Sequence, residues 1–67
     1  MADKRRVQLN ELITKRDENQ VKAQALFAKG DKAPEGDSAE DLATIKAINV
    51  ENADLNNQIV ELKSIID

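Results

Sequence analysis

Residues 45–66 of the chain read IKAINVENADLNNQIVELKSII, and this stretch decides the fold. Its apolar residues recur at alternating spacings of three and four, with one asparagine, Asn52, among them. On an α-helix this spacing places every member on one stripe, at the a and d positions of a heptad repeat. The stripe consists of Ile45, Ile48, Asn52, Leu55, Ile59, Leu62 and Ile66. Such a helix needs a partner helix, so we expect function to depend on what it packs against.

The first half of the chain predicts a second amphipathic helix, over residues 4–29. This region is rich in helix-favouring residues and contains no Gly or Pro, and Asp3 is a suitable N-cap residue. The same spacing runs through Leu9, Leu12, Arg16, Asn19, Ala23 and Leu26, with Phe27 at one edge. Because the middle of this stripe is polar, this helix is also expected to need a partner.

Residues 30–37 have the composition of a loop, since they hold both glycines and the only proline. Gly30 is expected to end the first helix in the left-handed conformation. The second helix is predicted over residues 38–67 and begins at Asp37 or Ser38, each followed three residues later by an acid, as in a capping box. No capping residue ends this helix. We therefore expect residues 1–67 to be a single helical domain cut from a longer protein.

A short loop between two helices makes them antiparallel neighbours. In each facing pair the two residue numbers then add up to the same value, the index sum. An index sum of 71 places Leu26 opposite Ile45. The same register places Asn19 opposite Asn52, where two buried amides can hydrogen bond to each other. A slip of one heptad would set each asparagine against an apolar residue. The sequence therefore predicts an all-α antiparallel two-helix hairpin of the coiled-coil type, with the amide pair fixing its register.

The residues beside the stripes are expected to extend this interface. In the same register Phe27 packs over Leu42 at the loop end, and Lys22 lies opposite Glu51 on the other flank. Arg16 fits the stripe least well. Its aliphatic stem is expected to lie along the groove while its guanidinium reaches water.

Some apolar residues fall outside the stripes, and they leave the assembly open. They are Val7, Val21, Val50, Val60 and Ile65. One interpretation is a second contact surface that pairs hairpins into a four-helix bundle, and the other is ordinary scattered surface residues. A parallel two-stranded zipper of the second helix, with Asn52 at an a position, is a further alternative. That zipper would leave Asn19 and the apolar face of the first helix unexplained.

Composition excludes several functional classes. The 67 residues include no Cys and no His, so disulfides, zinc or haem ligation and His-based acid–base catalysis are not expected. The net charge of −3 argues against nucleic acid or an anionic membrane as the main partner. No apolar run approaches the roughly 18 residues of a membrane span, and no signal-peptide core follows Met1. An intracellular origin fits these features.

Two segments resemble functional motifs but lack features that those motifs require. Residues 31–42 hold acids around a glycine, as in a calcium loop, but Ala33 and Leu42 occupy ligand positions. Basic residues precede a heptad run, as in a basic zipper, but Gly30 and Pro34 interrupt the single helix that such a zipper requires. No catalytic constellation is present, so we expect no enzymatic activity, no cofactor and no metal.

The amino-acid sequence of the two predicted helices resembles that of a known family of assembly domains. The segments that carry the resemblance are LNELITKR at 9–16, AQALFA at 23–28, DSAED at 37–41 and, within 48–63, an isoleucine followed by LNNQIVELK. Together they resemble the N-terminal scaffold-like segment, or delta domain, of tailed-bacteriophage major capsid proteins. The resemblance covers nearly the whole chain. It implies a fused scaffold inside the procapsid, assembled in the host cytoplasm and removed by a maturation protease.

The expected function is therefore structural. The resemblance implies self-association and contacts with other capsid subunits during procapsid assembly. The alternative from another class is a coiled-coil binding or dimerisation module of a regulatory protein, whose exposed helix captures another protein's helix. The length and composition of the parent polypeptide distinguish these two hypotheses.

Overall fold

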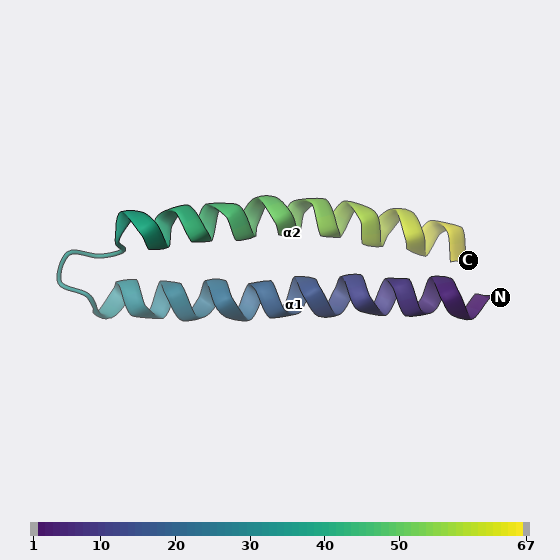
Figure 1. Ribbon diagram of the computed structural model, residues 1–67, viewed down its shortest axis with the longest axis horizontal. Coiled ribbons are helices and arrows are strands. Elements are labelled where there is room, and N and C mark those ends of the chain that lie inside the picture. The colour runs from purple at the N-terminus through teal and green to yellow at the C-terminus, as the bar shows by residue number, and fades with distance from the viewer. Residues whose placement is uncertain (1, 67) are drawn as a thin grey trace.

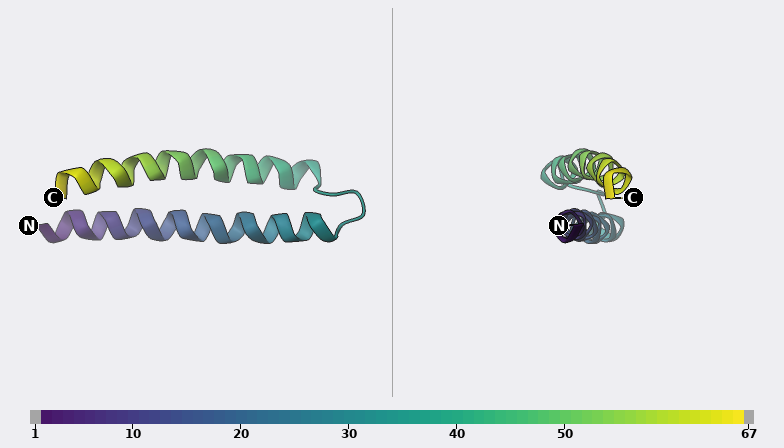
Figure 2. Two further views of the ribbon diagram at one scale, coloured as in Figure 1. Left: turned by 180° about the vertical axis from the view of Figure 1, so that it is seen from behind. Right: turned by 90° about the vertical axis from the view of Figure 1, so that its right-hand side faces the viewer.

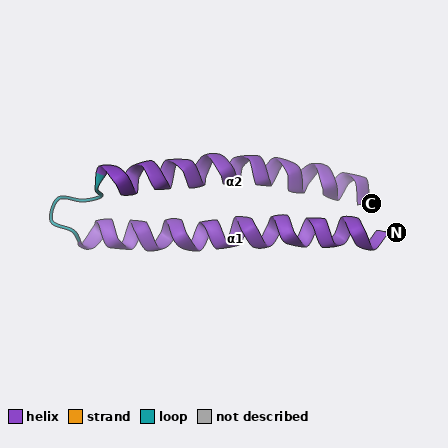
Figure 3. Cartoon of the chain, in the orientation of Figure 1, coloured by secondary structure: helices purple, strands orange, loops and turns teal. Residues whose placement is uncertain are grey.

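The computed structural model describes residues 2–66, and its side chains from residue 4 onward, as two long helices joined by one loop. Helix α1 spans Ala2–Lys32 and helix α2 spans Ala39–Ile66. The helices run side by side in opposite directions, with both chain ends at the same end of the molecule (Figure 1). No strand occurs among the described residues (Figure 3). The predicted all-α antiparallel hairpin is confirmed.

The hairpin is a rod with only two helices across its width. Its principal extents are 52 × 14 × 14 Å, and the end-on view shows one helix above the other with nothing beside them (Figure 2). Each helix can therefore cover only the stripe of the other that faces it. The remaining sides of both helices stay open to solvent.

The first helix ends later than the sequence indicated. Residues 30–32 are helical, so the prediction that Gly30 ends the helix in the left-handed conformation is wrong. Pro34 sets the end instead, because proline disfavours the helical conformation of the residue before it, Ala33. The amide of Ala33 still donates to the carbonyl of Lys29 at 3.1 Å and closes the last turn. The left-handed residue is Gly36, with φ of 79°.

Gly30 has a different role, which depends on the loop. It is buried inside the last turn of α1, and a Cβ atom built on it would collide with the carboxyl group of Asp37. The returning chain therefore passes close to the helix at this point. Glycine is present because of close approach and not because of backbone conformation.

Ser38 begins the second helix as its N-cap. Its Oγ accepts a hydrogen bond from the amide of Asp41 at 3.1 Å, and its carbonyl accepts one from the amide of Leu42 at 2.9 Å. Of the two predicted starts, Ser38 is the cap, while the Asp37 carboxyl group lies against Gly30 with Oδ1 buried and without a partner.

The outer bounds also differ from those predicted. Helix α1 already includes Ala2, so Asp3 lies inside the helix and not at its N-cap. Helix α2 is described to Ile66, and the predicted last residue, Asp67, lies outside the described residues.

The core is a single thin seam. Among residues 4–66, the buried apolar side chains are Ala23, Ile45, Ile48, Leu55 and Ile59. The most buried is Ile59, at 3% exposure, and no large side chain is completely enclosed. Each fully buried isoleucine or leucine contributes about 1.5–3 kcal/mol. A core of this size makes the hairpin sensitive to single substitutions along the seam.

Neither helix, over the described residues, contains a segment that is both long and apolar enough to cross a membrane.

Candidate interaction site

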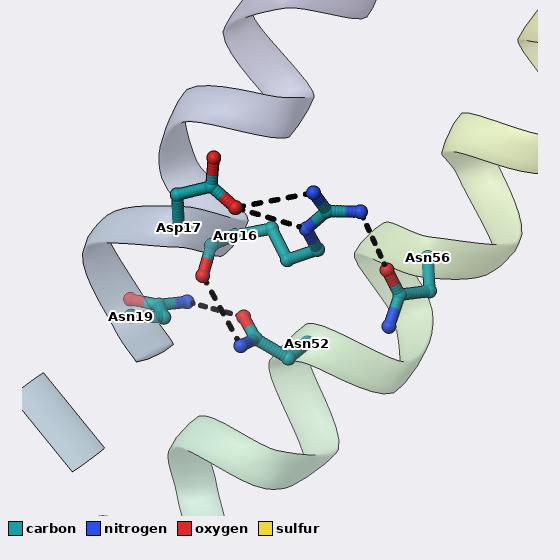
Figure 4. A network of polar contacts seen from close by, with 5 residues as sticks. All are labelled: Arg16, Asp17, Asn19, Asn52 and Asn56. Atoms are coloured by element: carbon teal, nitrogen blue, oxygen red, sulfur yellow. Dashed lines mark hydrogen bonds and ion pairs between the residues drawn. The ribbon is translucent and has the colours of Figure 1, made fainter. Parts of the chain in front are cut away.

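The polar centre of the seam is a layer of asparagine amides. Asn19 Nδ2 donates to Asn52 Oδ1 at 3.0 Å, so the two amides face each other as the index sum of 71 requires (Figure 4). Asn52 Nδ2 in turn donates to the backbone carbonyl of Arg16 at 3.2 Å. Asn19 is only 7% exposed, yet its amide nitrogen is fully used. The buried Asn19 and the partly buried Asn52 are therefore both hydrogen bonded.

Glu51 joins this layer in place of the ion pair expected for it. Its Oε1 accepts the second hydrogen bond from Asn19 Nδ2. No ion pair between Lys22 and Glu51 is present among the described residues, so that predicted pair is not formed. A carboxylate accepting from an amide makes a charge-assisted hydrogen bond, which is stronger than one between neutral groups. Glu51 thus connects the two helices through Asn19.

The guanidinium group of Arg16 was expected to reach water, but it also contacts the other helix. Its Nη1 donates across the seam to Asn56 Oδ1 at 3.3 Å, while Nε and Nη2 donate to Asp17 Oδ1 at 3.2 and 3.1 Å (Figure 4). Asp17 neutralises the guanidinium locally and orients it toward the other helix. The side chain stays 31% exposed, so this ion pair is partly hydrated.

These contacts concentrate the polar connections between the helices in one place. Within residues 4–66, the side-chain hydrogen bonds that cross between α1 and α2 all come from Arg16 or Asn19 on the first helix. Each contributes about 0.5–1.5 kcal/mol net, and a buried polar group left without its partner costs about 1–3 kcal/mol. A slip of one heptad would break all of them at once. We term Arg16, Asn19, Glu51, Asn52 and Asn56 the amide layer.

An ion pair connects the helices at the loop end. Lys29 Nζ lies 3.0 Å from Asp41 Oδ2, and the Asp41 side chain is only 17% exposed. Lys29 belongs to the last turns of α1 and Asp41 to the first turn of α2. Each side chain therefore has the charge that interacts favourably with the dipole at its own helix end. Such a surface pair contributes about 0–1 kcal/mol.

The other predicted interface residues divide by their depth in the seam. Asn19 and the five apolar core residues are buried. Partly buried are Leu9, Leu12, Arg16, Leu26, Asn52, Leu62 and Ile66. Phe27 and Leu42, which were expected to pack together, remain 47% and 52% exposed. They lie at the edge of the two-helix seam, where neither helix covers them fully.

Large apolar side chains also remain outside the seam. Val7, Val21, Val50, Val60 and Ile65 are all more than half exposed. With Leu9 and Ile45 taken as a positions of the heptad repeat, Val7, Val21 and Val50 occupy f positions. These positions lie on the outer side of each helix, farthest from the partner helix. Val60 and Ile65 lie on opposite broad sides of the hairpin.

The larger hollows among the described residues are open to solvent. They are grooves between rows of side chains, such as the one lined by Gln20, Gln24, Phe27, Asn49 and Asn56. Among the described residues, no group of three or more acidic, His or Cys side chains could hold a metal ion.

Comparison with protein-family models, with curated proteins and with solved structures found no match to this chain.

Proposed function

We propose that this chain is an assembly domain, whose task is to associate with further copies of itself and of the protein to which it belongs. The observation that carries the proposal is the contrast between its two kinds of surface. A register-specific amide layer fixes how the two helices pair, while large apolar side chains remain uncovered on their outer sides. Scattered apolar residues alone are normal on a surface. Here they accompany a seam too thin to make a firmly stable monomer.

The more specific proposal is a scaffold-like N-terminal segment of a tailed-phage major capsid protein. Its support is the resemblance of residues 9–16, 23–28, 37–41 and 48–63 to the delta domain. A rod of this shape suits a scaffold, because lateral contacts between rods can set the spacing of the subunits to which they are attached. In that setting the domain acts inside the procapsid through helix packing alone.

Sedimentation equilibrium over a wide range of protein concentration tests the assembly function. The expected result is a mass that rises with concentration to multiples of one chain. A single species with the mass of one chain at every concentration would contradict the proposal. Circular dichroism on the same samples provides the control, since the helix content must be high where the mass is measured.

The gene that encodes the chain separates the phage proposal from the regulatory alternative. Continuation past Asp67 into a long β-rich capsid domain supports the scaffold. A kinase or DNA-binding domain in that place supports a binding module that captures another protein's helix through the same exposed side chains. Termination at Asp67 would contradict the capsid proposal.

A further inference from the structure

The two broad sides of the hairpin differ in charge. One side carries the g positions of both helices, including Lys15, Lys22, Lys29 and Glu51. The opposite side carries the e positions. Arg6 and Lys63 end this row at the open end of the hairpin, and the e positions between them and the loop are Ile13, Gln20, Phe27, Leu42, Asn49 and Asn56, none of them charged. We term this second side the uncharged face.

The uncharged face has the composition of an interface centre. Depletion of charge and the presence of an aromatic residue are what distinguish buried interface cores from other surface. The only aromatic side chain of the protein, Phe27, lies there at 47% exposure, with Leu42 at 52%, and Val60, at a b position bordering this face, is 66% exposed. The guanidinium of Arg16 reaches this side, but it is already paired with Asp17 and Asn56.

The exposed area of the rod exceeds that of a compact protein of the same mass and is large enough for a partner to cover part of it. The chain exposes 5255 Å², whereas a compact protein of 7.4 kDa exposes about 4,200 Å². The excess of about 1,000 Å² is close to the roughly 800 Å² that each partner buries in a stable protein–protein interface. One broad side of the rod is the surface that could supply such an area.

We propose that two copies of the hairpin pack through their uncharged faces, in opposite directions, as a two-fold symmetric four-helix bundle. This inference rests on the self-association proposed above and names its surface. With the two-fold axis at Gln20, α1 lies over α1 of the second copy and α2 over α2. Phe27 then lies over Ile13 of the second copy, and Leu42 over Val60 of the second copy. Both apolar ends of the face are covered by one symmetric arrangement.

Charge selects this direction over the parallel one. The row of e positions ends in Arg6 and Lys63 at the open end of the hairpin, and Asp31 and Glu35 lie at the loop end. Antiparallel stacking brings Arg6 of each copy near Asp31 and Glu35 of the other. Parallel stacking would place Arg6 over Lys63 of the second copy, where like charges repel. Opposite charges across an interface fix orientation even where they add little affinity.

Cysteine cross-linking tests the arrangement, since the natural sequence has no Cys. Gln20 lies at the proposed two-fold axis, so Gln20→Cys is expected to give a disulfide-linked dimer under mild oxidation. Gln24→Cys is the matched control, the same residue type one turn along the same face. In the proposed dimer the two Gln24 positions are offset by about 12 Å along the axis, and a disulfide needs Cα atoms within about 7 Å. The control should therefore stay uncross-linked.

A second pair of variants tests the face without cross-linking. Phe27→Asp places a carboxylate on the uncharged face twice in each dimer and should raise the dimer dissociation constant about 100-fold or more. Val21→Asp, on the outer side of α1, should change it less than about threefold. Both residues are exposed in the hairpin, so circular dichroism should show unchanged helix content.

The outcomes separate this inference from the assembly function. Equal cross-linking of both cysteine variants, or equal weakening by Phe27→Asp and Val21→Asp, would overturn the uncharged face while leaving self-association intact. A chain that stays monomeric at every concentration would overturn both. Preferential cross-linking at Gln20 together with selective weakening at Phe27 would support the proposed bundle.

Discussion

Asn19 and Asn52 meet across the seam, 3.0 Å apart from Nδ2 to Oδ1, at the one layer where both helices carry an amide in place of an apolar residue. Asn19 Nδ2 also donates to Glu51, and Asn52 Nδ2 donates to the carbonyl of Arg16. After a slip of one heptad in either direction, each of these amides would face an isoleucine or leucine and lose its partner. The pair therefore specifies which residues meet, at some cost in the stability that an apolar layer would give.

Replacing both amides should separate stability from specificity. The double variant Asn19→Leu/Asn52→Leu is expected to be at least as stable as the natural chain, because both partners of a buried polar pair are removed together. It should also lose its single register and give several species in sedimentation velocity. In the single variant Asn52→Leu, Asn19 keeps its bond to Glu51, so the mixture should be less marked. A double variant that remains one species would show that the amides do not set the register.

Gly36 is the position where the backbone conformation favours glycine. Its φ of 79° lies in the left-handed region, and a Cβ atom there would meet nothing within 4 Å. Gly36→Ala should therefore lower the free energy of unfolding by about 1 kcal/mol through backbone strain alone. Urea denaturation measures this change. Glu35→Ala, one residue earlier in the loop, is the control and should change the stability by less than about 0.5 kcal/mol.

Gly30 and Asp37 should be energetically coupled. Gly30 is helical, so alanine there should stabilise the helix by about 1 kcal/mol, but its Cβ meets the Asp37 carboxyl group. In the Asp37→Ala background the full gain should appear, and in the natural background it should be smaller. A double-mutant cycle from thermal or urea unfolding gives the difference. Equal effects in both backgrounds would rule out the contact.

Ile59 should be the most costly residue to truncate. Its side chain is 3% exposed, and Ile59→Ala removes buried methyl groups and leaves a cavity, at a cost of about 2–5 kcal/mol. Val50→Ala, at a site 65% exposed on the outer side of the same helix, should cost less than about 1 kcal/mol. For so thin a core, Ile59→Ala should leave the chain largely unfolded at room temperature. Helix content from circular dichroism checks this, and comparable stability of the two variants would contradict the burial.

The sequence predicted the hairpin because two uninterrupted heptad stripes admit few arrangements. It also placed Asn19 opposite Asn52, since only one register aligns the polar positions. It misplaced the end of α1 because Gly30 and Pro34 are competing signals, and the proline decided the outcome. The roles of Glu51 and Asn56 depend on side-chain rotamers beside the seam, which periodicity does not specify. Phe27 is exposed because the rod is only two helices wide. The register tells which residues face each other, but not how far the two helices cover them.

Nuclear Overhauser spectroscopy of the isotopically labelled chain tests the register most directly. The register with Asn19 opposite Asn52 predicts cross-peaks between the side-chain amide protons of these two residues. Cross-peaks from the Asn19 amide to the methyl groups of Ile45 or Ile59, one heptad to either side, would contradict it.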